Sequence, residues 1–280
     1  MSLHGFERIA VVGATGAVGT EALRLLEECR VTRPQDIDLE RIAGTNRIEI
    51  VYEDLDGATA RVLRIGNIAR IRISNRIEDV GWRRFSIAHE LGHLRLGHEV
   101  PDDAHEAVER VCKPLDKARS IPEREASVFS SEFLMPEPMV RPRCAVHHVT
   151  LEPARRISSE FTTSVLASAM RFVELTDERC AIAYSVLGRV KWIKPSASFP
   201  DWIPRGRRLD PRSAAFEYHE SGAIDDAAQV MTADVWLPRD KMDNANVQLV
   251  EHSALIPALG VVYSMLWIPG REVSHLDLPS

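Results

Sequence analysis

The sequence predicts an α+β fold, and three observations support this prediction. Apolar residues recur at helical spacing over residues 20–30 and again around HELGH, residues 89–93. Between these segments lie short runs rich in β-branched residues, separated by turn signals, which predict a small antiparallel sheet leading into the HELGH helix. From about residue 179 the sequence becomes rich in Val, Leu and aromatic residues, which indicates a β-rich C-terminal module.

The first half of the chain is expected to form two helices and then three strands. In order, these are a helix over 20–30, a short helix over about 37–43, and strands over 47–52, 58–65 and 68–75. The first helix is indicated by the stripe of Ala22, Leu25 and Leu26, which repeats at helical spacing. In the last strand Ile71 and Ile73 alternate with arginines, as expected of a strand with one buried face.

The second half is expected to begin with helices and to end with strands. Helices are predicted over about 122–133 and as a pair within 151–175 whose spacing is that of a helix-turn-helix, and strands within 180–194, 230–238 and 246–270. Residues 195–211 have the composition of a linker. The expected organisation is an N-terminal extension (1–19), an α+β domain that carries the HELGH helix (20–145), a helix-turn-helix-like segment (146–178) and a β-rich C-terminal domain (179–280).

Composition excludes several classes of protein. With 45% apolar and 27% charged residues the chain should pack as a globule, and its net charge of −6 does not favour a protein that coats nucleic acid. No apolar stretch approaches the roughly 20 residues that span a bilayer, so no membrane partner is expected. The four cysteines are scattered without a CxxC pair, which favours a reducing, cytoplasmic location. The arginines of 151–175 are offset by glutamates, so direct DNA binding is not expected.

The HELGH segment predicts a metal site. On a helix, His89 and His93 lie one turn apart on the same face and can bind one zinc ion (Zn²⁺). Glu90 would then lie beside the ion and act as general base toward a water molecule. Gly92 costs about 1 kcal/mol of helix stability relative to alanine, which suggests that something approaches the backbone there. The alternative is an amphipathic helix that carries two histidines without a metal.

A third ligand has to come from elsewhere in the sequence. His98 does not have the spacing of a metzincin ligand, so it is expected past the helix end, in solvent. Glu123 falls near the centre of the apolar face of the helix over 122–133, where an unpaired charge would be costly. Glu123 is therefore the preferred ligand, and Glu125, which falls to one side of that face, is the alternative.

Two segments of the sequence resemble the ImmA/IrrE family of zinc metallopeptidases. These are RRFSIAHELGHLRL (83–96) and EREASVFSSEFLMP (123–136), and weaker similarity extends over about 20–270. The resemblance implies a zincin-like peptidase domain in which His89, His93 and Glu123 hold zinc and Glu90 is the catalytic base. It also implies a protein substrate, a helix-turn-helix repressor whose cleavage relieves transcriptional repression. We expect the substrate to lie as an added strand along the edge of 68–75.

Two departures from the family pattern support a rival interpretation. Ser127 stands where the family usually has Asn or Asp, and Ser130 where it usually has Ala. Either substitution could weaken the support of the metal ligands. The rival is a non-catalytic regulator that binds a repressor or DNA and has a structural or vestigial metal site.

The N-terminal glycine run points to a different chemistry. Gly13, Gly16 and Gly19 follow an apolar run and precede a helix, as in dinucleotide-binding turns. Residues 8–28 resemble the start of an aspartate-semialdehyde dehydrogenase. That fold needs further parallel βα units, which the sequence does not predict. The run is therefore interpreted as part of an extension, and no nucleotide cofactor is expected.

Overall fold

The computed structural model describes residues 16–55, 59–65, 68–98, 120–200, 203–222, 225–238, 247–256 and 259–274. Its α-helices are α1 (Ala17–Glu28), α2 (Leu39–Thr45), α3 (Val80–Arg95), α4 (Ile121–Leu134), α5 (Glu137–Val140), α6 (Glu152–Phe161), α7 (Val165–Leu175) and α8 (Ala214–Ser221). Short 3₁₀ helices occupy Pro34–Asp36 (η1), Arg141–Cys144 (η2) and Ala233–Val235 (η3). The strands are β1 (Ile48–Glu53), β2 (Ala60–Ile65), β3 (Ile68–Ser74), β4 (Cys180–Val186), β5 (Arg189–Pro195), β6 (Gln229–Thr232), β7 (Gln248–Ile256) and β8 (Val261–Trp267).

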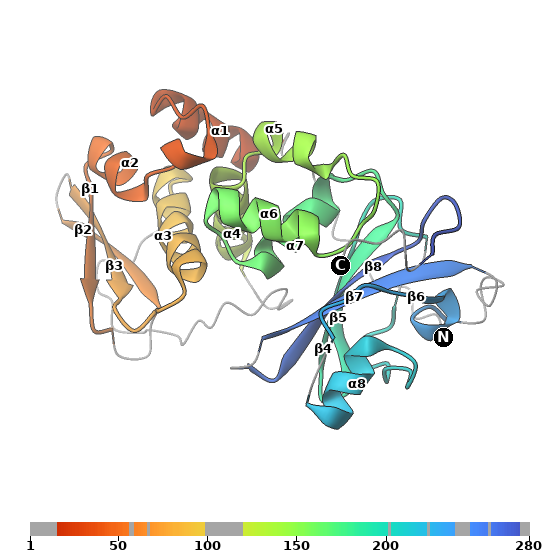
Figure 1. Cartoon of the computed structure of the whole chain (residues 1–280). Coiled ribbons are helices and arrows are strands. Elements are labelled where there is room, and N and C mark those ends of the chain that lie inside the picture. The colour runs from red at the N-terminus through yellow and green to blue at the C-terminus, as the bar shows by residue number, and fades with distance from the viewer. Residues whose placement is uncertain are drawn as a thin grey trace, which may run out of the picture.

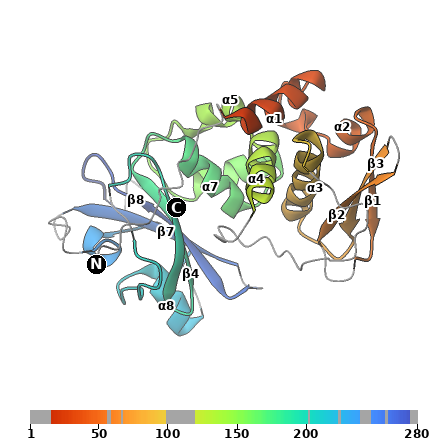
Figure 2. The same cartoon turned by 180° about the vertical axis from the view of Figure 1, so that it is seen from behind.

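The helices lie between two sheets, which confirms the α+β class. Figures 1 and 2 show the sheet of β1, β2 and β3 with α2 at one end of the molecule, helices α1 and α3 to α7 in the middle, and the larger sheet with α8 at the other end. One hydrophobic core runs from α1 through the middle helices to one face of the larger sheet, and a second core fills the other face of that sheet.

The small sheet has a different pairing from the one expected. Its order is β1-β3-β2, with β2 antiparallel and β1 parallel to β3, so the sheet is mixed. Strand β3 takes the centre because its Ile71 and Ile73 are completely buried, whereas Tyr52 on β1 is 44% exposed. The alternation of residues shows which face of a strand is buried, but it does not show which strands are neighbours.

Helices α3 and α4 pack closely against each other at Gly92. Asp79 caps α3 by accepting a hydrogen bond from the backbone N–H of Trp82 at 2.6 Å. A Cβ atom built on Gly92 would lie 3.0 Å from the ring of Phe129 and 3.3 Å from the Cα atom of Ala126, both on α4. The glycine therefore lets the backbones of the two helices approach closely, as its cost in helix propensity suggested.

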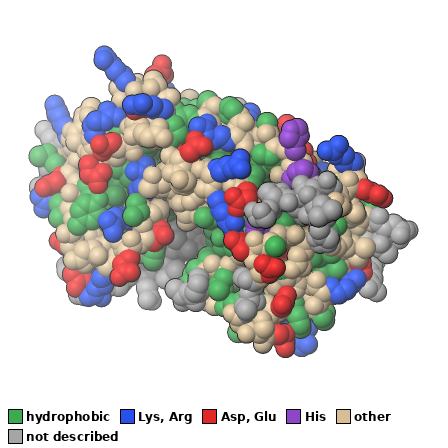
Figure 3. Space-filling view, viewed as in Figure 1, with side chains coloured by type: hydrophobic (Ala, Val, Ile, Leu, Met, Phe, Trp, Pro, Cys, Tyr) green, Lys and Arg blue, Asp and Glu red, His purple; other side chains and the backbone are tan. Residues whose placement is uncertain are grey.

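The helical pair α6–α7 packs into the body of the protein. Ile157, Phe161 and Phe172 are buried in the main core. Arg171, which could have contacted DNA, is buried instead: it forms an ion pair with the equally buried Glu132 on α4, and its Nε donates to the carbonyl oxygen of Met135 at 3.0 Å. On the face shown in Figure 3, the described acidic and basic side chains are interspersed.

The larger sheet is antiparallel throughout, with the order β5-β4-β8-β7-β6. The prediction of a linker over 195–211 is wrong, because Phe199, Ile203 and Leu209 are buried in the second core. The strand expected over 230–238 is short: β6 ends at Thr232, and Trp236 beyond it is buried and donates to the Glu251 carboxylate at 2.8 Å. These apolar residues are spaced irregularly, which made the segments difficult to assign from sequence.

The described residues also bear on membrane crossing and on the state of the cysteines. Within these ranges no helix combines the length and the apolar character that a membrane crossing requires. Cys29, Cys144 and Cys180 are buried and free of disulfide bonds. Burial raises the pKa of the Cys144 thiol to about 11, which keeps this thiol protonated at neutral pH.

Candidate metal centre

Three side chains from α3 and α4 converge beside the close contact of these helices. The Nε2 atoms of His89 and His93 lie 3.1 Å apart. Glu123, in the first turn of α4, brings Oε2 to 3.2 Å from His89 Nε2 and Oε1 to 3.4 Å from His93 Nε2. The three side chains are only 12–14% exposed. Among the described residues, these three side chains form a group that could hold a metal ion.

The distances among these three side chains fit a tetrahedral zinc ion. With bonds of about 2.0–2.1 Å, tetrahedral ligand atoms lie about 3.3 Å from one another. The two imidazole nitrogens, 3.1 Å apart, are close to that value, and each has one Glu123 oxygen nearby, Oε2 at 3.2 Å from His89 and Oε1 at 3.4 Å from His93. The donor set of two imidazole nitrogens and one carboxylate is also one that zinc uses in catalytic sites. The residues present therefore fit the cofactor that the sequence predicts.

Glu90 and Glu125 occupy different positions from Glu123. Glu90 follows His89 on α3 and is partly exposed, as a group that meets a substrate must be. Glu125 does not join the cluster of three. Its Oε2 lies 3.0 Å from Nε2 of His98. The structure thus brings Glu123, and not the alternative Glu125, to the two histidines of the HELGH segment.

His98 is not in solvent, contrary to the expectation from its spacing. Its side chain is only 10% exposed, and its Nδ1 lies 3.0 Å from Nδ1 of His93. The helix ends in a Schellman motif: Gly97 has a φ of 68°, and the N–H of His98 donates to the carbonyl oxygen of His93 at 3.0 Å. This motif folds the residue after the glycine back over the last turn. Gly97 was the sequence signal that could have located His98.

The polar contact at Nδ1 of His89 is longer than the contact at Nδ1 of His93. Ser127 Oγ lies 3.5 Å from His89 Nδ1, at the limit of a hydrogen bond, and donates to the carbonyl oxygen of Glu123 at 2.8 Å. Ser130, the other departure from the family pattern, donates to the backbone of Ala126 at 2.7 Å and is completely buried. Only the serine at position 127 therefore bears on the ligand geometry.

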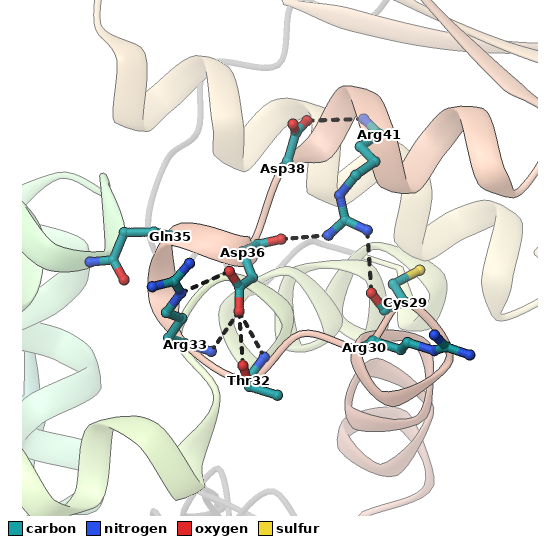
Figure 4. A pocket seen from close by; sticks show the side chains of 8 residues that line it. All are labelled: Cys29, Arg30, Thr32, Arg33, Gln35, Asp36, Asp38 and Arg41. Carbon is teal, nitrogen blue, oxygen red and sulfur yellow. Dashed lines mark hydrogen bonds and ion pairs between the residues drawn. The ribbon is translucent and has the colours of Figure 1, made fainter.

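A surface pocket lies apart from this centre and does not contain its residues (Figure 4). The Arg33 guanidinium and the backbone N–H of Thr32 lower the pKa of Asp36, one of its lining residues, to about 2. Arg41 donates to the carbonyl oxygens of Cys29 and Asp36 at 3.3 and 2.8 Å. These polar groups satisfy one another and join the end of α1 to α2, so we assign the pocket a structural role.

Comparisons with known proteins agree with this geometry. The family model described as IrrE N-terminal-like domain matches residues 44–173, slightly less than half of the chain, and these residues include the whole candidate centre. No curated protein matches the sequence. A solved structure described as a Mycobacterium tuberculosis transcriptional regulator has a similar fold, with 12% identity and a TM-score of 0.57 over 90% of this chain and 75% of that one.

The comparisons support the ImmA/IrrE resemblance and a fold of the metallopeptidase type. At 12% identity, the solved structure is evidence for the fold alone. The resemblance of residues 8–28 to aspartate-semialdehyde dehydrogenase is unconfirmed. Gly13 lies outside the described residues, while Gly16 precedes the first turn of α1.

Proposed function

We propose that this protein is a zinc-dependent endopeptidase that hydrolyses a peptide bond in a protein substrate. The observation that carries the proposal is the convergence of His89 Nε2, His93 Nε2 and the Glu123 carboxylate, which places each nitrogen within 3.4 Å of a carboxylate oxygen. The match of residues 44–173 to the IrrE N-terminal-like domain supports it independently of these distances. His89, His93 and Glu123 are the proposed ligands.

Glu90 is the proposed catalytic base. Bound zinc would supply Lewis-acid chemistry by polarising the scissile carbonyl group and acidifying water. Glu90 takes a proton from the attacking water and delivers it to the leaving amine, so a single carboxylate serves as base and then as acid. Glu90 follows His89 directly on α3 and is not one of the three residues that could hold a metal ion, which supports this role.

The prediction of which strand pairs with the substrate must be revised. Both sides of β3 are already paired, β1 on one side and β2 on the other, so the expected addition of substrate to 68–75 is wrong. Among the described residues, β1 and β2 are the edge strands of the small sheet, and β2 packs on α3 whereas β1 packs mainly on α2. We therefore propose that an extended substrate segment pairs with β2, beside the helix that carries Glu90.

The proposed substrate is a helix-turn-helix repressor in the cytoplasm, as the family resemblance implies. The solved structure of similar fold is described as a transcriptional regulator, which agrees with a role in regulation. In this proposal the peptidase domain comprises 20–145, the helix-turn-helix-like segment 146–178, and a sensory domain 179–280.

The second candidate is a non-catalytic regulator with a structural metal site. The 3.5 Å separation of Ser127 Oγ from His89 Nδ1 favours it, because a poorly oriented ligand weakens a catalytic metal centre. In that case the protein would act by binding a repressor or DNA.

Purified protein loaded with zinc distinguishes the two candidates. We expect one zinc ion per chain in the wild type and in Glu90→Gln, and none in His93→Ala, measured by elemental analysis. The loaded proteins are then incubated with a peptide library derived from a bacterial proteome, and newly formed N-termini are labelled and sequenced. The wild type should generate new N-termini in a chelator-sensitive manner, and Glu90→Gln should not.

Each outcome of this experiment has a consequence. Zinc binding without cleavage by the wild type would reject the peptidase and favour the regulator. Cleavage that persists in zinc-loaded Glu90→Gln would reject the role of that carboxylate. Absence of zinc from the wild type would reject the metal centre itself.

A further inference from the structure

We infer that His98 and Glu125 are positioning residues that set the tautomer and the ring orientation of His93 for metal binding. This inference rests on the proposed zinc centre, but it does not depend on whether the centre cleaves peptides. It follows from a continuous chain of close polar contacts: His93 Nδ1 to His98 Nδ1 at 3.0 Å, and His98 Nε2 to Glu125 Oε2 at 3.0 Å.

In the arrangement that we infer, the direction of the hydrogen bonds starts at the carboxylate. An ionised carboxylate only accepts, so a singly protonated His98 ring that bonds to Glu125 carries its proton on Nε2 and donates it to Glu125. Nδ1 of His98 is then an acceptor. His93 must therefore carry its own proton on Nδ1, which leaves the lone pair of its Nε2 pointing at His89 and Glu123. This is the tautomer that can bind zinc through Nε2.

Backbone geometry holds the pair in place. The left-handed Gly97 and the bond from the N–H of His98 to the carbonyl of His93 fix the two imidazoles next to each other. Their ring centroids are 5.1 Å apart and the rings are nearly perpendicular, at 70°. His98 is 10% exposed, so its ring is largely shielded from water that could compete for these bonds.

The alternative is that His98 and Glu125 form an ordinary surface ion pair, which explains less of the observed geometry than a positioning role does. Glu125 is 42% exposed, and an exposed His–Glu contact alone would contribute little. Such a pair would not require His98 to face the distal nitrogen of a metal ligand. The contrast with His89 is also informative, because the contact of its Nδ1 with Ser127 Oγ is longer, at 3.5 Å.

The test measures zinc affinity and tautomer in the full-length protein, without any substrate. Zinc affinity is obtained by competition with a chromophoric chelator for the wild type, His98→Phe, His98→Gln and Glu125→Ala. Phe keeps a ring but can neither accept a hydrogen bond from His93 nor donate one to Glu125, whereas the Gln side chain can do both. We expect about a 10- to 100-fold loss of affinity for His98→Phe, a smaller loss for Glu125→Ala, and recovery of most of the loss in His98→Gln.

The matched control is His147→Phe, because His147 is an exposed histidine outside the candidate centre, and it should bind zinc as the wild type does. Nitrogen-15 NMR of the histidine rings supplies the second measurement. His93 should be protonated on Nδ1 in the zinc-free and zinc-loaded wild type and should lose this preference in zinc-free His98→Phe. Thermal unfolding of the zinc-free proteins identifies any variant that fails to fold, in which case Glu125→Ala carries the test.

The outcomes separate this inference from the proposed function. Zinc affinity of His98→Phe or, if that variant fails to fold, of Glu125→Ala within twofold of the wild type would overturn the inference, and so would a His93 protonated on Nε2. A wild type that does not bind zinc would overturn it together with the metal centre. If the affinities and the tautomer change as expected while no peptide is cleaved, the positioning role stands and only the peptidase proposal fails.

Discussion

Replacement of Gly92 by alanine tests whether the close approach of α3 and α4 creates the metal centre. The added Cβ atom would lie 3.0 and 3.2 Å from the Cδ1 and Cγ atoms of Phe129 and 3.3 Å from the Cα atom of Ala126. The Phe129 ring is completely buried and Ala126 contributes a backbone atom, so neither neighbour can move aside freely. Relief of these contacts requires α4 to shift by a few tenths of an ångström.

The expected effect on stability is small. Overpacking a core costs about 1–3 kcal/mol, whereas alanine gains about 1 kcal/mol over glycine inside a helix. The zinc-free Gly92→Ala protein should therefore lose between about 0 and 2 kcal/mol of unfolding free energy. The two contributions partly cancel, so the variant should fold.

The expected effect on metal binding is larger. Glu123 lies on α4 and both histidines lie on α3, so a shift between these helices changes the ligand separations directly. Metal–ligand distances tolerate about ±0.2 Å, which is comparable to the required shift. We expect zinc affinity to fall by about tenfold or more, measured by chelator competition.

Gly44→Ala is the matched control for this experiment. Gly44 also lies in a helix, α2, but a Cβ atom there would meet nothing within 4 Å. This variant should become more stable, by up to about 1 kcal/mol, and keep its zinc affinity. If Gly92→Ala binds zinc within twofold of the wild type, the helix contact does not set the ligand geometry and the reasoning is refuted.

Three further predictions concern other parts of the structure. Ser127→Asn should orient His89 better and raise zinc affinity severalfold in the same chelator assay; an unchanged affinity would count against it. Arg171→Met leaves the buried Glu132 carboxylate without its ion-pair partner and should lower the unfolding free energy measured in urea by about 3–5 kcal/mol. Adding Glu132→Leu to this variant should recover much of the loss. Equal stability of the single and the double variant would contradict this expectation. Burial lowers the pKa of His252 below its ordinary 6.5, so the neutral imidazole contributes its full stability above pH 6.5 and this stability is lost as pH falls through the folded-state pKa. Between pH 8 and 5 the wild type should therefore lose more thermal stability than His252→Gln. Parallel plots of melting temperature against pH for the two proteins would refute this role of His252.

The sequence alone predicted most of the elements because local patterns determine them. The helices over 20–30 and 122–133 and the strands over 47–52, 58–65 and 68–75 all have counterparts within a few residues of their expected bounds. Helical periodicity, turn residues and the alternation of apolar residues act over short distances along the chain, and a single sequence displays them directly. The sequence also predicted the grouping of His89, Glu90 and His93, because the two histidines lie one turn apart on a single helix.

The tertiary structure decided what depends on residues far apart in the chain. Glu123 reaches the histidines, and Glu125 does not, because of how α4 packs on α3 across Gly92. The parallel pairing of β1 with β3 and the burial of Arg171 likewise depend on neighbours that no local pattern specifies. His98 is the intermediate case: its position is fixed by a local turn at Gly97, but its partner Glu125 comes from another helix. Local conformation is set by short-range sterics and hydrogen bonds, whereas side-chain partnership is set by the packing of whole helices and strands.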